Sequence, residues 1–184
     1  FVDALLAVGM DKEAISWFAQ LDDASPLKLL MRLKTNLVAP PAAIAQARAA
    51  LARSNNIAFW IVLQHAAALA KDRMLHVEAL ENLLQFTPER ASERAAALAV
   101  ELWRAYALAA QEVANQNQLL VGDDAGWADF AARRGAVSAS AGRALFAYLA
   151  QQSKVRATRQ TAQLQLTVSL RDAGLVLAAV RLFD

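Results

Sequence analysis

The sequence predicts an all-α protein built from antiparallel helical hairpins, and three observations lead to that prediction. Alanine, leucine, glutamine and arginine dominate the composition, and these residues lose little side-chain freedom in a helix. The 184 residues include only 6 Gly and 4 Pro, which leaves little room for long irregular loops. Helix-start signals recur at short intervals, so helices of roughly 10 to 15 residues joined by brief turns should pack as antiparallel neighbours.

Residues that favour the N-cap position mark several of the expected helix starts. Ser25 and Thr87 each precede a proline, which suits the first helical position because its missing N–H would have no partner there. Further candidate caps are Asp11, Asp123, Asp124 and Ser138. The expected helices span residues 1–8, 11–21, 26–36, 41–53, 56–71, 74–86, 88–116, 123–133, 139–152, 155–173 and 175–184.

An internal repeat favours a stacked array of hairpins over a closed bundle. Gly9, Ala14 and Phe18 recur near the other end of the chain, at a constant offset, as Gly174, Ala179 and Phe183. We read each copy as a helix that ends at a left-handed glycine, followed by a turn and a second helix. The small alanine lets the second helix lie close to the first, and the aromatic residue fills the groove beyond it. A degenerate copy has Ala79 and Leu83 at the same positions but lacks the glycine.

This pattern resembles the tetratricopeptide repeat, whose second helix carries an alanine, an aromatic residue four positions later, and then a closing proline. Ala14, Phe18 and Pro26 stand at that spacing, with Glu13 and Ile15 also as in the family. The resemblance implies a right-handed α-solenoid, a tetratricopeptide-like superhelix, as a single repeat domain over residues 1–184. Because both terminal copies begin or stop partway through a repeat, we expect this domain to be cut from a longer array at both ends.

Residues 163–170, QLQLTVSL, alternate polar and apolar side chains as a half-buried strand would. The C-terminal repeat copy instead makes residues 155–173 the helix before Gly174. On a helical wheel two nearly opposite apolar stripes appear, so we expect this helix to bury two faces. One stripe holds Ala157, Leu164 and Val168, and the other holds Val155, Ala162, Leu166, Leu170 and Ala173.

A polar strip between those stripes is the candidate binding site. It consists of Arg156, Gln160, Gln163, Thr167 and Arg171. The family resemblance would place it in the concave groove, which the first helix of each hairpin lines. Two arginines flanking amides suit carboxylates, phosphates or an extended peptide backbone. The alternative is an ordinary solvated helix face.

No residue pattern identifies a reaction, a metal site or a cofactor site, and we expect neither catalysis nor a cofactor. The chain has no cysteine, and its two histidines, His65 and His76, are better explained as core or boundary residues than as ligands. The carboxylate pairs Glu78 with Glu81 and Glu89 with Glu93 are better explained as solvated helix faces, or as i,i+4 pairs such as Glu89 with Glu93, than as acid–base pairs. The tryptophans should pack between hairpins, with Trp127 the best candidate for an exposed platform.

The distribution of charge and apolar residues restricts the possible partners. The whole chain has a net charge of +2. Residues 131–184 contain eight Lys or Arg but only two Asp, so the C-terminal third is basic. The longest strongly apolar run, IAFWIVL, is far shorter than the ~20 residues that cross a bilayer. We therefore expect no membrane span. Nothing in the sequence indicates the oligomeric state.

The expected function is a non-catalytic scaffold that binds another protein, or an extended peptide or polymer, through a helical groove. The resemblance suggests a bacterial cell-envelope role, in assembly or polymer export, and a periplasmic location, with the cytoplasm as the alternative. One alternative function is the superhelical, non-catalytic region of a larger cell-wall enzyme such as a soluble lytic transglycosylase. A second is binding of anions or RNA by the basic C-terminal third, although nucleic acid is not the expected partner.

Overall fold

The computed structural model describes residues 4, 7–54, 56–87, 92–120 and 122–180, and within them the chain is helical without any strand. The all-α prediction is therefore confirmed. The chain divides into two compact units, Phe1–Asp72 and Arg73–Asp184. The single array over residues 1–184, and its continuation beyond both ends, stay predictions.

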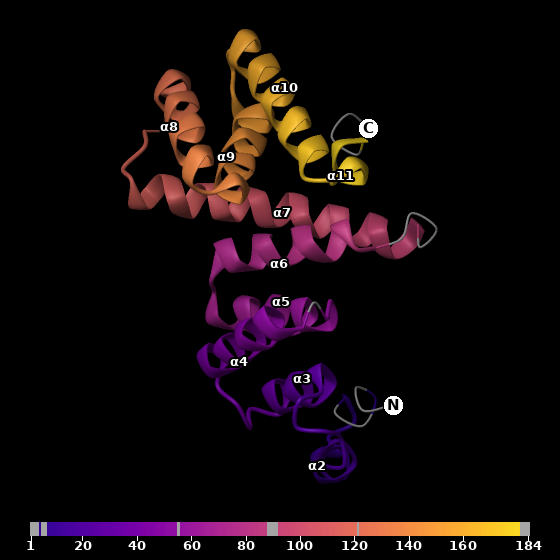
Figure 1. Cartoon of the computed structure of the whole chain (residues 1–184). Helices are drawn as coiled ribbons and strands as arrows, with labels where there is room; N and C mark the ends of the chain where they lie inside the picture. Colours follow the sequence, from indigo (N-terminus) through magenta and orange to yellow (C-terminus); the bar gives the residue numbers. More distant parts are fainter. Residues whose placement is uncertain (1–3, 5–6, 55, 88–91, 121, 181–184) are drawn as a thin grey trace. The chain divides into compact units, whose positions relative to one another are not determined.

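Unit 1 consists of helices that pack mainly against their neighbours in sequence (Figure 1). They are α2 (Asp11–Ala19), α3 (Pro26–Lys34), α4 (Pro40–Arg53) and α5 (Ala58–Ala70). Helix α3 contacts α2, α4 and α5, and α4 also packs along α5. The repeat residues Ala14 and Phe18 are buried together with Met31 of α3. Their predicted contact with the preceding helix, residues 1–8, lies mostly outside the described residues and stays a prediction.

Unit 2 is built around one long helix, α7, with shorter helices on either side of it (Figure 1). Its elements are α6 (Arg73–Gln85), α7 (Ser92–Gln116), α8 (Asp124–Val137), α9 (Ala139–Gln152), α10 (Arg156–Asp172) and α11 (Val176–Val180). Helix α7 contacts α6, α9 and α11, while α9 also packs against α8 and α10. Consecutive helices thus contact each other in most cases, as stacked hairpins would.

Most predicted helix starts agree with the structure to within one or two residues. Helix α3 begins at Pro26 after Ser25, and the carboxylate of Asp123 accepts a hydrogen bond from the Gly126 N–H at 2.9 Å. Asp11 is an exception because Met10 holds the N-cap position and Asp11 is already helical. Thr87 donates its hydroxyl to the Leu83 carbonyl at the end of α6, and Pro88 lies outside the described residues.

Both repeat glycines have the left-handed backbone that the sequence predicts. Gly9 has φ = 75° and Gly174 has φ = 73°. At the end of α10 the Gly174 N–H binds the Arg171 carbonyl and the Leu175 N–H binds the Leu170 carbonyl, the two bonds of a Schellman motif. This motif ends the helix and satisfies carbonyl groups that α10 itself leaves without partners.

The C-terminal repeat copy departs from the N-terminal copy in its packing. In α11 it is Ala178 that is fully buried, while Ala179 is only partly buried, and Phe183 lies outside the described residues. The degenerate copy lacks the glycine, but its residues at the alanine and aromatic positions, Ala79 and Leu83, are both buried in unit 2.

The QLQLTVSL stretch is helical, as predicted, but the expectation that α10 buries two faces is wrong. Ala162, Leu166 and Leu170 are buried, whereas Leu164 is 62% exposed and Val168 is 37% exposed. The reason is that α9 covers one side of α10, and no described helix covers the side that holds Leu164 and Val168. Val155 and Ala157 are exposed as well.

Candidate functional site

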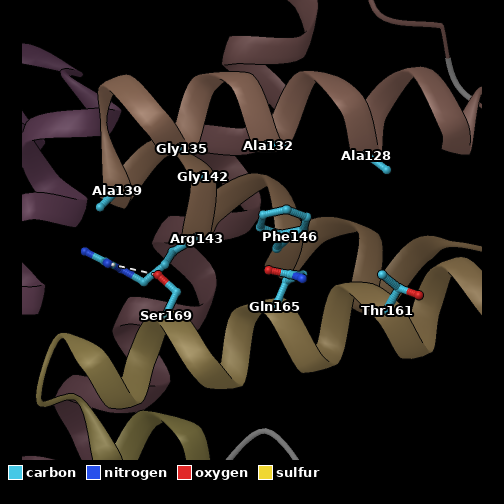
Figure 2. Close-up of a pocket in the computed structure, with 10 residues that line it drawn as sticks. All are labelled: Ala128, Ala132, Gly135, Ala139, Gly142, Arg143, Phe146, Thr161, Gln165 and Ser169. Atoms are coloured by element: carbon cyan, nitrogen blue, oxygen red, sulfur yellow. Dashed lines mark hydrogen bonds between the residues drawn. The ribbon is translucent and has the colours of Figure 1, made fainter.

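A pocket of about 450 Å³ lies between α8, α9 and α10, entirely within unit 2 (Figure 2). We call it the α8–α10 pocket. Its volume falls in the range of about 300–1,000 Å³ that is common for ligand sites. It is lined by Ala128, Ala132, Gly135, Ala139, Gly142, Arg143, Phe146, Thr161, Gln165 and Ser169. Small side chains from α8 and α9 therefore face polar side chains from α10.

Two glycines set the close approach of α8 and α9 on one side of the pocket. A Cβ atom at Gly142 would lie 2.6 Å from the Cα atom of Gly135, closer than real Cβ contacts allow. The two helices are joined by Ser138 alone, whose hydroxyl accepts a hydrogen bond from the Ala141 N–H. Helix α8 runs to Val137, past the predicted end at residue 133, so Gly135 is helical where it meets α9. These glycines keep that side of the pocket free of bulky side chains.

The opposite wall is a row of polar side chains on α10. Thr161, Gln165 and Ser169 follow each other at i, i+4 and i+8 and therefore share one helix face. Within the described residues, the side chains of Thr161 and Gln165 make no hydrogen bond, and both residues are exposed. Gln165 points toward the ring of Phe146 in Figure 2. We call these three residues the polar row.

A buried ion pair closes one end of the pocket. Arg143 in α9 donates from Nε to Glu81 Oε1 at 2.7 Å and from Nη2 to Glu81 Oε2 at 2.6 Å. The two side chains are 8% and 7% exposed. Glu81 also accepts hydrogen bonds from the hydroxyls of Tyr106 at 2.5 Å and Ser140 at 2.6 Å. The remaining terminal nitrogen of Arg143 donates to the hydroxyl of Ser169 in the polar row at 3.2 Å.

This network joins four helices of unit 2 through one carboxylate and one guanidinium. Glu81 comes from α6, Tyr106 from α7, Arg143 from α9 and Ser169 from α10. Burial raises the pKa of Tyr106 well above its ordinary value, and the nearby charge of Glu81 raises it further. Burial works against the charged form of Arg143, but the hydrogen bond to Glu81 and its charge outweigh that effect and raise the Arg143 pKa. Arg143 therefore stays charged in the core.

Raising the pH above about 10 should destabilise unit 2 less in Tyr106→Phe than in the parent protein. Unfolded Tyr106 loses its proton near its ordinary pKa of 10.0, whereas the folded protein keeps that proton to higher pH. The contribution of neutral Tyr106 is thus fully present below pH 10 and is lost as the pH rises toward the folded-state pKa. Above pH 10 the free energy of unfolding of the parent protein should therefore fall by up to about 1.4 kcal/mol more per pH unit than that of Tyr106→Phe. Urea unfolding between pH of about 9 and about 11 measures it, and equal slopes in both proteins would contradict the prediction.

The predicted binding strip does not line the α8–α10 pocket. Arg156, Gln160 and Arg171 are exposed, and Gln163 and Thr167 are partly buried. Thr167 donates its hydroxyl to the Gln163 carbonyl at 2.8 Å, and Arg171 forms an ion pair with Asp172 at 2.8 Å. As a second binding surface the strip stays a prediction.

The residues that line the pocket lie on a different face of α10, separated from the predicted strip by the buried stripe. The polar row has the same i, i+4 spacing that singled out the predicted strip. The signal was therefore present in the sequence, and only the position of α9 shows which strip borders a pocket.

Two expectations about side-chain environments are wrong. Glu81 is not on a solvated face, because Arg143, more than 60 residues away in sequence, compensates its charge in the core. Trp127 is not an exposed platform, because it is 4% exposed and stacks on Tyr148 with ring centroids 4.5 Å apart. Its indole nitrogen donates to the Leu120 carbonyl at 3.0 Å. Trp127 is thus a packing residue, the role expected for the tryptophans in general.

Both histidines occupy partly buried positions on helices. His65 Nδ1 lies 3.0 Å from the Ile61 carbonyl, and His76 Nε2 lies 3.3 Å from Glu101. Among the described residues, no group of three or more His, Cys, Asp or Glu side chains could hold a metal ion. Glu89 falls outside the described part of the chain, so its predicted pairing with Glu93 has no structural description.

None of the helices in the described ranges is both long enough and apolar enough to cross a membrane.

The comparisons with known proteins are negative: no protein-family model matches the chain, and neither the curated proteins nor the solved structures give a match.

Proposed function

We propose that this protein is a non-catalytic helical scaffold that binds a segment of a partner protein in the α8–α10 pocket. The observation behind the proposal is the pocket itself, in which Thr161 and Gln165 have no hydrogen-bond partner within the described residues. Polar groups placed at the edge of a concave, partly apolar surface can fix the position of a ligand. Exposed small residues such as Ala132 leave room for one.

The buried ion pair favours a protein partner over a nucleic acid. Arg143 belongs to the basic C-terminal third, yet it is buried and neutralised by Glu81. Arg171 and Arg133 are each paired with a nearby aspartate, at 2.8 Å in both cases. Fewer arginines are therefore available to phosphate groups than the sequence alone indicates, and phosphate contacts supply most of the affinity for nucleic acids.

The finer parts of the proposal rest on the resemblance to the tetratricopeptide repeat. They are a right-handed superhelix, a role in the assembly of the bacterial cell envelope or in polymer export, and a periplasmic location. The buried pair Ala14 and Phe18 in unit 1 supports the repeat interpretation, because these residues stand at the spacing of the family's second helix.

Filling the pocket should weaken peptide binding, whereas the same substitution one helical turn away should not. A random peptide library displayed on phage is selected against the parent protein, and the enriched peptides are synthesised. We expect Ala132→Trp to weaken their binding at least about tenfold, because the indole would occupy the space between α8 and α10. Fluorescence anisotropy of the labelled peptides measures the affinity.

Ala136→Trp is the matched control, because Ala136 is also exposed on α8 but does not line the pocket. Its peptide affinity should stay within about twofold of the parent value. A library that yields no peptide, or peptides that bind Ala132→Trp and the parent protein equally well, would rule out the proposed function.

A further inference from the structure

We propose that the α8–α10 pocket takes an uncharged, extended peptide segment, held through its main chain by the polar row Thr161, Gln165 and Ser169. This inference rests on the proposed function and specifies the chemistry of the ligand. Three observations support it: the spacing of the polar row, the charge balance of the pocket wall, and the apolar residues that border the row.

The spacing of the polar row matches the repeat of an extended peptide. Residues four apart in an α-helix are about 6 Å apart along its axis. In an extended chain, main-chain groups that face the same side recur every two residues, or about 6.6 Å. Over the three positions of the row the two repeats stay nearly in register. The Gln165 amide and the Thr161 hydroxyl can each donate to a carbonyl and accept from an N–H.

The charge balance of the wall favours a ligand without charge. Arg143 is the only charged residue that lines the pocket within the described part of the chain, and Glu81 binds it through two hydrogen bonds. The remaining terminal nitrogen of the Arg143 guanidinium donates to the Ser169 hydroxyl. A carboxylate or phosphate entering the pocket would lose water without gaining an uncompensated cation, which is unfavourable. A peptide main chain is neutral and gains hydrogen bonds from the polar row.

The exposed apolar residues of α10 lie directly beside the polar row. Leu164 precedes Gln165 and Val168 precedes Ser169, so the two rows run in parallel along the helix. Side chains of an extended peptide alternate between two sides. One set would cover Leu164 and Val168, which are 62% and 37% exposed, while the other would face the small residues of α8 and α9. The peptide segment that fits the pocket therefore has main-chain N–H and C=O groups available for hydrogen bonds, and its side chains are small or apolar and uncharged.

Three blocked heptapeptides test the inference directly. The first is acetyl-Ser-Val-Ser-Val-Ser-Val-Ser-amide, the second carries N-methyl groups at the valine positions, and the third has glutamate in place of serine. We expect the first to bind, the other two to bind at least about tenfold more weakly, and the affinity of the first to be nearly independent of salt. Titrations are followed by the NMR signals of Gly135 and Gly142, which lie in the pocket wall.

The variants Gln165→Leu and Gln163→Leu distinguish peptide binding by the polar row from peptide binding by the predicted strip. Both remove a glutamine from α10, but only Gln165 lines the pocket. Gln165→Leu should weaken the first peptide about tenfold, and Gln163→Leu should leave it within about twofold. Circular dichroism spectra of both variants establish that they are folded.

Several outcomes would overturn the inference. They are failure of the first peptide to bind, equal binding of its N-methylated form, equal loss in the two glutamine variants, and tighter binding of the glutamate peptide with a steep salt dependence. Library peptides that are acidic yet sensitive to Ala132→Trp would also overturn it, while leaving the proposed function intact.

Discussion

Replacing Arg143 with alanine is expected to lower the free energy of unfolding of unit 2 by about 3–5 kcal/mol. The substitution leaves the Glu81 carboxylate 7% exposed and without its cation. The hydroxyls of Tyr106 and Ser140 still donate to the carboxylate, but they cannot neutralise its charge. Hydrogen–deuterium exchange of the α6 and α9 amides measures the loss, because both helices hold the pair.

Arg133→Ala is the matched control for the buried pair. Arg133 also forms an ion pair, with Asp129 at 2.8 Å, but the two side chains are 70% and 68% exposed. Solvent screens such a pair, so its loss should cost below about 1 kcal/mol. Combining Glu81→Gln with Arg143→Met should be less damaging than Arg143→Ala alone, because no buried charge is left behind. Similar exchange rates in Arg143→Ala and Arg133→Ala would show that the network contributes little to stability.

Gly142→Ala is expected to destabilise unit 2 by about 1–3 kcal/mol, even though alanine is the better helix former. The added Cβ would lie 2.6 Å from the Cα of Gly135, and a backbone atom cannot move away as a flexible side chain can. Helices α8 and α9 would have to separate next to the single-residue turn at Ser138. Thermal unfolding followed by circular dichroism measures the effect.

Gly135→Ala serves as the control for this contact. A Cβ atom at Gly135 would lie 3.4 Å from the Cα of Gly142, which is close to an ordinary van der Waals distance. Alanine also favours the helix, so the stability should stay unchanged or rise by up to about 1 kcal/mol. A loss in Gly135→Ala as large as that in Gly142→Ala would contradict the asymmetric contact between the two helices.

The substitutions Arg143→Ala and Gly142→Ala both alter the α8–α10 pocket. Arg143 and Gly142 are neighbours in α9, and both line the α8–α10 pocket. Arg143 ties one end of the pocket to α6 and α10, while Gly142 sets the distance to α8. Damage to either should therefore affect the shape of the pocket as well as stability. The binding tests use Ala132 and Gln165 instead, because neither residue takes part in these two contacts.

Local sequence signals were sufficient to predict the helices. Capping residues, prolines and the composition act within a few residues of the chain, so starts such as Pro26 and Asp124 could be located without any tertiary contact. The left-handed turn at Gly174 follows from the freedom of glycine, which is also a local property. The same signals show why QLQLTVSL is a helix, once the turn that follows it is recognised.

Only the tertiary structure decided which helix faces are covered and where the site lies. Glu81 and Gln165 sit in helical segments much like their neighbours, but one meets Arg143 in the core and the other faces a pocket. Both outcomes depend on contacts between residues far apart in the sequence, and these follow from how α9 packs on α6, α8 and α10. Helix periodicity shows which residues share a face, whereas packing determines which face is buried, which is exposed, and which borders a binding site.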